Sequence, residues 1–184
     1  SQLHPYTLLV GLLAVAAFAL HGAIYLYLKT DGALQKRLTE TMWTSFGLFL
    51  VLYLLCTMYT LAAYPHVLKN FEDYSWLWCL PVLHVFAVAN IPRALYLHRP
   101  AYAFASSCCN ILALIALVGI GLYPYVLHDP AAPEAGLTIF NAASSAKTLK
   151  IGLLIAALGM PFVLAYTAVI YWTFRGKVSL NVHS

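Results

Sequence analysis

The chain has 184 residues, of which 62% are hydrophobic and 9% are charged, and its formal net charge is +4. Roughly a quarter of the residues in soluble domains are charged, so this composition excludes an ordinary soluble fold. The cations lie at the ends of apolar runs rather than in one basic patch, which excludes a nucleic-acid partner.

Five apolar runs predict membrane-spanning helices at residues 7–28, 42–64, 75–91, 102–123 and 151–174. A helix of about 20 apolar residues, at roughly 1.5 Å per residue, crosses a hydrocarbon core of about 30 Å. The third run is the weakest because Pro81, His84 and Asn90 interrupt it. The sequence therefore predicts an all-α polytopic membrane protein, a single transmembrane domain over residues 1–184 with a four-helix bundle plus one further helix.

A polar loop precedes the last predicted helix. Residues 137–145 read LTIFNAASS, and Asn and Ser side chains accept hydrogen bonds from the free N–H groups that open a helix. Small residues inside the other runs, among them Gly11, Gly22, Gly119 and Gly121, are predicted sites of close helix contact.

The distribution of cations predicts the orientation. One side holds seven cations: Lys29, Lys36, Arg37, Arg93, Arg99, Arg175 and Lys177. The other side holds three: Lys69, Lys147 and Lys150. By the positive-inside rule we expect the N-terminus outside and the C-terminus in the cytoplasm. Because the chain starts at Ser1 without a methionine, and its five crossings start outside, we expect it to be the C-terminal part of a longer subunit.

Neutral polar residues inside the spans are the candidates for function, since the predicted spans contain no Asp, Glu, Lys or Arg. These candidates, as buried polar or subunit-contact residues, are His21, His84, Asn90 and Asn110. His21 and His84 lie at matched positions in two helices that run in the same direction, which would suit bis-histidine haem ligation. The commoner role is a hydrogen bond from each imidazole to a neighbouring helix. No nucleophile triad, phosphate loop or metal-ligand cluster is present, so no catalytic residue and no metal site is predicted.

Three motifs in the same order resemble subunit II of the cytochrome bd-type quinol oxidases. They are His21-Gly22-Ala23 with residues 25–34 (YLYLKTDGAL), residues 137–145 (LTIFNAASS) with 148–150 (TLK), and residues 161–167 (PFVLAYT) with 171–178 (YWTFRGKV). The resemblance covers essentially the whole chain but only the C-terminal half of the family's subunit, which has nine membrane helices.

The resemblance implies a respiratory complex of the prokaryotic inner (plasma) membrane that oxidises quinol and reduces dioxygen to water. In that family the haems b and d belong to the partner, subunit I, and subunit II is a haem-free supporting subunit. We therefore expect this chain to bind no haem, to contact subunit I and membrane lipids, and to carry no catalytic centre of its own. The resemblance leaves open a bound quinone or lipid and small accessory subunits.

Two alternatives stay open at this point. One is a small b-type membrane cytochrome that holds its haem through His21 and His84. The other is a membrane anchor unrelated to respiration, which the three motifs disfavour.

Overall fold

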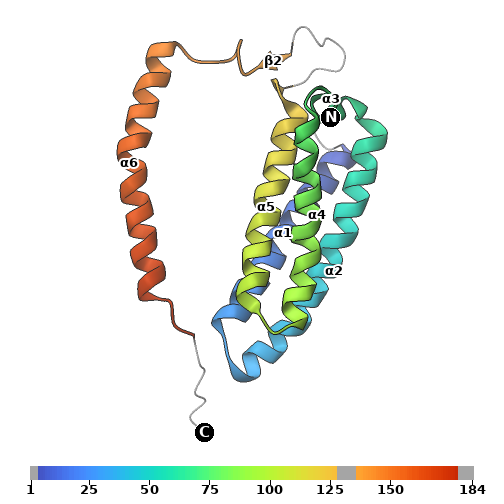
Figure 1. Ribbon diagram of the computed structural model, residues 1–184, viewed down its shortest axis with the longest axis vertical. Helices are drawn as coiled ribbons and strands as arrows, with labels where there is room; N and C mark the ends of the chain where they lie inside the picture. Colours follow the sequence, from blue (N-terminus) through green and yellow to red (C-terminus); the bar gives the residue numbers. More distant parts are fainter. Residues whose placement is uncertain (1–3, 128–135, 178–184) are drawn as a thin grey trace. The chain divides into compact units, whose positions relative to one another are not determined.

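The computed structural model describes residues 4–127 and 136–177 (Figure 1). These residues belong to two compact units, one that extends to Gly121 and one that spans Leu122–Lys177. The described residues include 5 helices long and apolar enough to cross a membrane, which confirms the predicted number. The span at Ser75–Tyr96 has the lowest hydropathy of the five, as the sequence predicts.

Four long helices form the first unit. They are α1 (Pro5–Lys29), α2 (Gly32–Ala63), α4 (Cys79–Tyr96) and α5 (Pro100–Leu122). Three short helices connect α2 to α4: η1 (Pro65–Leu68), α3 (Lys69–Asp73) and η2 (Ser75–Trp78). Side-chain hydrogen bonds join α1 to α2, α2 to α4, α4 to α5 and α5 to α1. The four helices therefore surround a common core in chain order, as a four-helix bundle.

The core of the bundle follows the helical repeat. Buried residues on α2 recur at seven-residue spacing, at Met42, Phe49 and Cys56. The other helices contribute Leu13, Ala16, Ala17, Leu20, Ala23 and Ile24 from α1, Val88, Ile91, Ala94 and Leu95 from α4, and Ala103 from α5. A seven-residue repeat keeps one face of a helix toward its partners along its length. The many alanines allow the helices to pack closely without a large side chain between them.

Two helix boundaries differ from the prediction. Helix α2 begins at Gly32 rather than near residue 42, so the charged segment with Lys36, Arg37 and Glu40 is helical. Charged residues end a membrane span but do not end a helix, because beyond the lipid they are solvated. Helix α4 continues to Tyr96 and contains Pro92, whereas the predicted span ended at residue 91. A membrane helix in a bundle tolerates an internal proline, because groups on neighbouring helices can bond to the backbone carbonyl that the proline leaves free.

Three of the glycines predicted as sites of close helix contact make no such contact inside the bundle. Within the described residues, a Cβ added at Gly11, Gly22 or Gly119 would meet nothing within 4 Å. At Gly121 the added atom would lie 3.4 Å from Cβ of Val67, which is ordinary contact. The small residues that are buried in the bundle are alanines and serines, such as Ala16, Ala103 and Ser107.

The second unit contains a short hairpin and one long helix. Strands β1 (Tyr125–Leu127) and β2 (Leu137–Thr138) pair antiparallel, an element that is not among the predictions from sequence. Helix α6 (Ala146–Thr173) starts five residues before residue 151, where the predicted span begins. Its N-cap is Ser145, whose hydroxyl accepts a hydrogen bond from the Thr148 backbone N–H at 3.3 Å. The predicted capping role of the polar loop is confirmed at this serine.

Side chains and backbone bonds together hold the rest of the polar loop, with the backbone N–H of Ile139 donating to the carbonyl of Pro124 at 2.9 Å. Oδ1 of Asn141 accepts from the backbone N–H of Thr138 at 2.6 Å, and its amide nitrogen donates to the carbonyl of Gly136 at 3.1 Å. The Thr138 hydroxyl accepts from the backbone N–H groups of Phe140 and Asn141. Asn141 thus closes the turn after β2, and Ser145 opens the helix.

Candidate functional site

A chain of three polar side chains crosses the bundle through His84. His84 on α4 is 0% exposed and Asn110 on α5 is 1% exposed. Nε2 of His84 lies 2.7 Å from Oδ1 of Asn110, and Nδ1 lies 3.3 Å from the hydroxyl of Tyr53 on α2. Because a carbonyl oxygen has no proton to give, Nε2–H is the donor to Asn110. In the neutral ring, Nδ1 then accepts from Tyr53, so both imidazole nitrogens are used.

His21 makes a second bond of this kind between α1 and α5. Its Nδ1 lies 2.8 Å from Oγ of Ser107, and Ser107 donates its own proton to the Phe104 carbonyl at 2.7 Å. A hydroxyl has one proton, so Ser107 is the acceptor and His21 Nδ1–H is the donor. The His21 ring also stacks on Phe104, with centroids 4.9 Å apart. In the neutral ring Nε2 of His21 keeps its lone pair.

One face of α5 receives these bonds. Its buried residues are Ala103, Ser106, Ser107, Asn110 and Ala113. The spacing of three and four residues places them on one side of the helix, where every side chain is small or polar. Ser106 and Tyr53 are not among the candidates that the sequence predicts. The spacing of Ser106, Ser107 and Asn110 on one face of an apolar helix was the signal that could have identified Ser106.

The structure brings His21 and His84 to the same stretch of α5. Their partners on that helix, Ser107 and Asn110, are three residues apart, which is about 4.5 Å along the axis. The expectation of similar depth is therefore met, but by two separate hydrogen bonds to α5. Among the described residues, no group of three or more His, Cys, Asp or Glu side chains could hold a metal ion.

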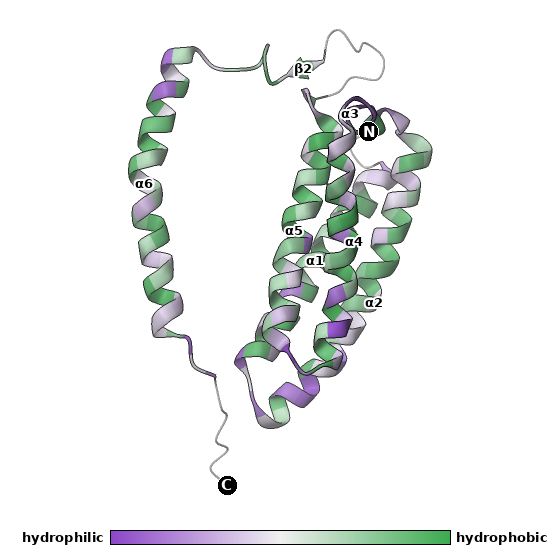
Figure 2. Ribbon diagram, viewed as in Figure 1, coloured by the Kyte–Doolittle hydropathy of each residue, from purple (hydrophilic) through white to green (hydrophobic). Residues whose placement is uncertain are grey.

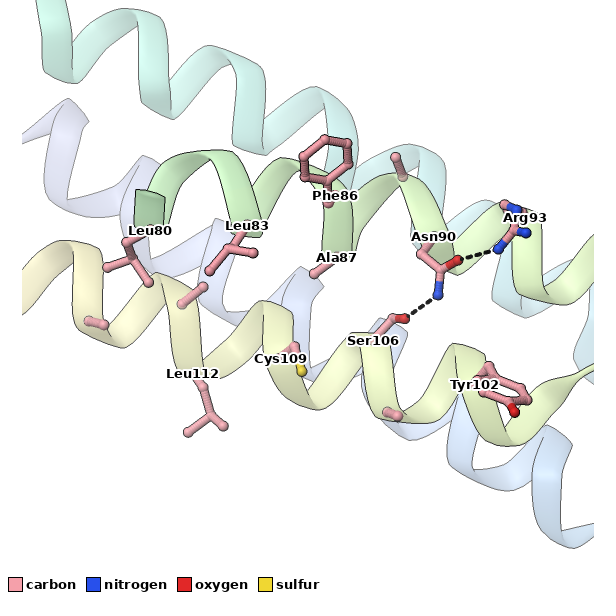
Figure 3. Close-up of a pocket in the computed structure, with 14 residues that line it drawn as sticks. Leu80, Leu83, Phe86, Ala87, Asn90, Arg93, Tyr102, Ser106, Cys109 and Leu112 are labelled. Atoms are coloured by element: carbon pink, nitrogen blue, oxygen red, sulfur yellow. Dashed lines mark hydrogen bonds between the residues drawn. The ribbon is translucent and has the colours of Figure 1, made fainter. Parts of the chain in front are cut away.

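Asn90, the remaining candidate, lies at an open groove between α4 and α5 (Figure 3). Its amide nitrogen donates to Oγ of Ser106 at 2.8 Å, and its Oδ1 accepts from Nη1 of Arg93 at 3.1 Å. The groove has a volume of about 860 Å³, and its lining is otherwise mostly apolar, with Leu83 and Leu112 among the residues. Asn90 therefore connects the helix pair and positions the one charged residue of the groove.

Arg93 belongs to a basic end of the bundle. The end with the α1–α2 and α4–α5 turns carries polar residues in Figure 2, and its cations are Lys29, Lys36, Arg37, Arg93 and Arg99. The same end carries two carboxylates, Asp31 and Glu40. The opposite end, in α3, has one cation and two carboxylates: Lys69, Glu72 and Asp73. One end of the bundle is thus markedly more positive than the other.

Five apolar helices, with neutral polar side chains bonded to one another inside a bundle, define a polytopic α-helical membrane protein. The family model for cytochrome bd terminal oxidase subunit II matches residues 1–174, and the chain belongs to that family.

Known members of the family are similar along almost the whole chain. Subunit 2 of the cytochrome bd-I ubiquinol oxidase of Escherichia coli K12 is 28% identical over 99% of this chain and 56% of its own length. A probable cytochrome oxidase subunit 2 of Haemophilus influenzae is 24% identical, over 97% of this chain and 54% of its own length. Subunit 2 of the cytochrome bd ubiquinol oxidase of Bacillus subtilis is 23% identical, over 96% of this chain and 52% of its own length. The chain therefore spans about half the length of these relatives.

Proposed function

We propose that this chain acts in a haem-free supporting subunit of a cytochrome bd-type terminal oxidase in the inner membrane of a bacterium. The complex oxidises quinol and reduces dioxygen to water, and its haems b and d are bound by a partner, subunit I. The observation that carries the proposal is the match of the subunit II family model to residues 1–174. The relatives named above as ubiquinol oxidase subunits support the reaction class.

The hydrogen bonds of His84 support the haem-free role. A haem-ligating histidine must offer one imidazole nitrogen to iron. His84 uses Nε2 for Asn110 and Nδ1 for Tyr53, so ligation would break a buried bond. His21 still has Nε2 with a lone pair, but a bis-histidine site needs both rings. This argues against the alternative of a small b-type cytochrome that uses His21 and His84.

The supporting role follows from how the bundle is held. Hydrogen bonds between membrane helices contribute about 0.6 kcal/mol each on average, with a maximum of about 1.7 kcal/mol. Such bonds fix which faces of the helices meet, because each donor reaches its acceptor at only one alignment of the two helices. The outer faces stay apolar, as at Leu12, Val15 and Phe18 of α1, which are 56%, 67% and 62% exposed. A rigid bundle with an apolar exterior suits contact with lipid and with another membrane subunit.

A difference spectrum separates the proposed role from the alternative. The protein is purified from membranes with its partners, the subunits are then separated in detergent, and reduced-minus-oxidised spectra are recorded for each. We expect the haem bands to stay with the partner and to be absent from this chain. The variants His84→Leu and His21→Leu should leave the haem bands of any assembled complex unchanged. A b-type band in the separated chain, lost in either variant, would overturn the proposal.

A further inference from the structure

The groove between α4 and α5 has the form of a site for an amphiphile. Leu80 and Leu112 lie toward one end of the lining, and Arg93 and Tyr102 lie toward the other (Figure 3). From Leu80 to Arg93 the groove follows α4 for thirteen residues, about 20 Å. A lipid chain from one leaflet reaches through about half of a hydrocarbon core of roughly 30 Å. The groove is thus long enough for one such chain.

The positive charge of Arg93 at one end of the groove favours an amphiphile with an anionic headgroup. Arg93 is exposed, and it is the one charged residue in the lining. Its Nη1 donates to Asn90, which is itself bonded to Ser106, so the side chain is directed by two further residues. Within the described part of the chain no carboxylate pairs with Arg93. A guanidinium has five N–H donors in a planar fork that matches phosphate oxygens, so most of its donors remain for a ligand.

We propose that this groove binds an anionic phospholipid, with an acyl chain along Leu83 and Leu112 and the phosphate at Arg93. The position of Arg93 at the basic end of the bundle agrees with this, because that end raises the local concentration of anionic headgroups. A neutral isoprenoid quinone would fill the apolar part of the groove but would leave the guanidinium without a counter-charge. This inference does not depend on the proposed oxidase role, because the measured quantity is lipid bound to this chain.

The test compares the binding of defined lipids by native mass spectrometry. The purified protein, together with any partner that accompanies it, is delipidated in a neutral detergent. It is then titrated with phosphatidylglycerol, with phosphatidylcholine of the same acyl chains, or with a neutral isoprenoid quinone. We expect one phosphatidylglycerol to be retained in preference to phosphatidylcholine. Arg93→Gln should weaken the phosphatidylglycerol complex about fivefold. Arg93→Lys keeps the charge but not the planar fork, so it should restore only part of the affinity.

Two further variants distinguish binding in the groove from attraction by the summed positive charge of the surface. Arg37→Gln removes one positive charge from the same end of the bundle, but on α2, and Arg37 does not line the groove. We expect this matched control to bind phosphatidylglycerol like the unmodified protein. Ala105 is exposed and lines the groove, so Ala105→Phe should block it and weaken binding without any change of charge. It also provides a second readout if Arg93→Gln fails to fold.

Three results would overturn the proposal. The first is equal loss of binding in Arg93→Gln and Arg37→Gln, which would mean that only the summed surface charge matters. The second is equal retention of phosphatidylglycerol and phosphatidylcholine. The third is displacement of the bound lipid by the quinone at equal concentration together with no effect of Arg93→Gln, which would assign the groove to an isoprenoid tail.

Discussion

Nε2 of His84 lies 2.7 Å from Oδ1 of Asn110, and both side chains are buried between α4 and α5. In lipid neither group has water as an alternative partner, so each depends on the other. The bond also fixes the register of the two helices, because a slip by one turn would move the imidazole about 5.4 Å along α5. A change at either residue of this pair should therefore be felt in the packing of α4 against α5.

We predict that Asn110→Leu destabilises the protein by about 0.6–1.7 kcal/mol, because it leaves the buried Nε2–H of His84 without an acceptor. Thermal unfolding of the purified protein in detergent measures the loss. Tyr53→Phe serves as the background for the control, because it removes the hydroxyl that donates to Nδ1 of His84. In that background, the double variant His84→Phe with Asn110→Leu removes both partners of the Nε2 bond and should recover part of the stability that Asn110→Leu loses. If the double variant is less stable than Asn110→Leu in the same background, the assigned dependence is wrong.

A second prediction concerns the bond between α1 and α5. His21→Leu and Ser107→Ala remove opposite sides of one hydrogen bond, so each should lower stability by about 0.5–1.5 kcal/mol. Their combination should cost less than the sum of the two, because the bond can be lost only once. A double-mutant cycle from unfolding curves checks this. Strict additivity would contradict the contact between Nδ1 of His21 and Oγ of Ser107.

The N-cap of α6 gives a third prediction. Ser145→Ala removes the acceptor of the Thr148 backbone N–H and should cost about 1 kcal/mol of local stability. Amide hydrogen exchange at Thr148 should become faster. Ser144→Ala is the matched control, since it changes the same residue type one position earlier in the exposed loop. Equal exchange rates in the two variants would refute the cap.

Two glycines with opposite surroundings provide a fourth prediction. A Cβ at Gly136 would lie 3.0 Å from Cδ1 of Tyr125 and 3.2 Å from the backbone oxygen of Leu127, so Gly136→Ala should disturb the hairpin. A Cβ at Gly22 would meet nothing within 4 Å in the described residues, and Gly22→Ala should stabilise α1 by about 0.5–1 kcal/mol. Unfolding temperatures of the two purified variants should move in opposite directions. A lower unfolding temperature for Gly22→Ala would contradict this assignment.

The fifth prediction is the orientation in the membrane. The basic end of the bundle should face the cytoplasm, by the positive-inside rule. A membrane-impermeant maleimide added to intact spheroplasts should label Glu72→Cys, at the opposite end, and should label Lys36→Cys only after the membrane is opened. The protein without an added cysteine controls for reaction of the native thiols. Labelling of Lys36→Cys in intact spheroplasts would reverse the orientation.

The sequence was sufficient for the number of membrane helices because hydropathy alone decides it, and the family resemblance is confirmed. It did not give the start of α2, since the break in the helix depends on Thr30, Asp31 and a Gly32 with φ of 68°, rather than on the charges that follow. It also missed the hairpin of β1 and β2, whose strands have 3 and 2 residues and carry no strand periodicity.

The candidate polar residues were identifiable because an unpaired polar group is costly in lipid. Their partners were not, because a partner depends on how each helix is rotated about its axis. Tyr53 could be assigned to a bond with His84 only once α2 and α4 were placed side by side. The spacing of Ser106 with Ser107 and Asn110 could mark it as a buried polar residue, but its partner, Asn90, was identified only from the packing of α4 on α5.

The bond between His84 and Asn110 also bears on how the protein is made. The span that contains α4 has a mean hydropathy of 1.4, against 2.0–2.2 for the other four, so it is the segment that a translocon would release into lipid least readily. Only three residues separate α4 from α5, which carries the acceptor for the imidazole. If α4 and α5 leave the translocon together as a helical hairpin, the His84 imidazole enters the bilayer already bonded to Asn110. Insertion of α4 would then occur only after α5 has been synthesised.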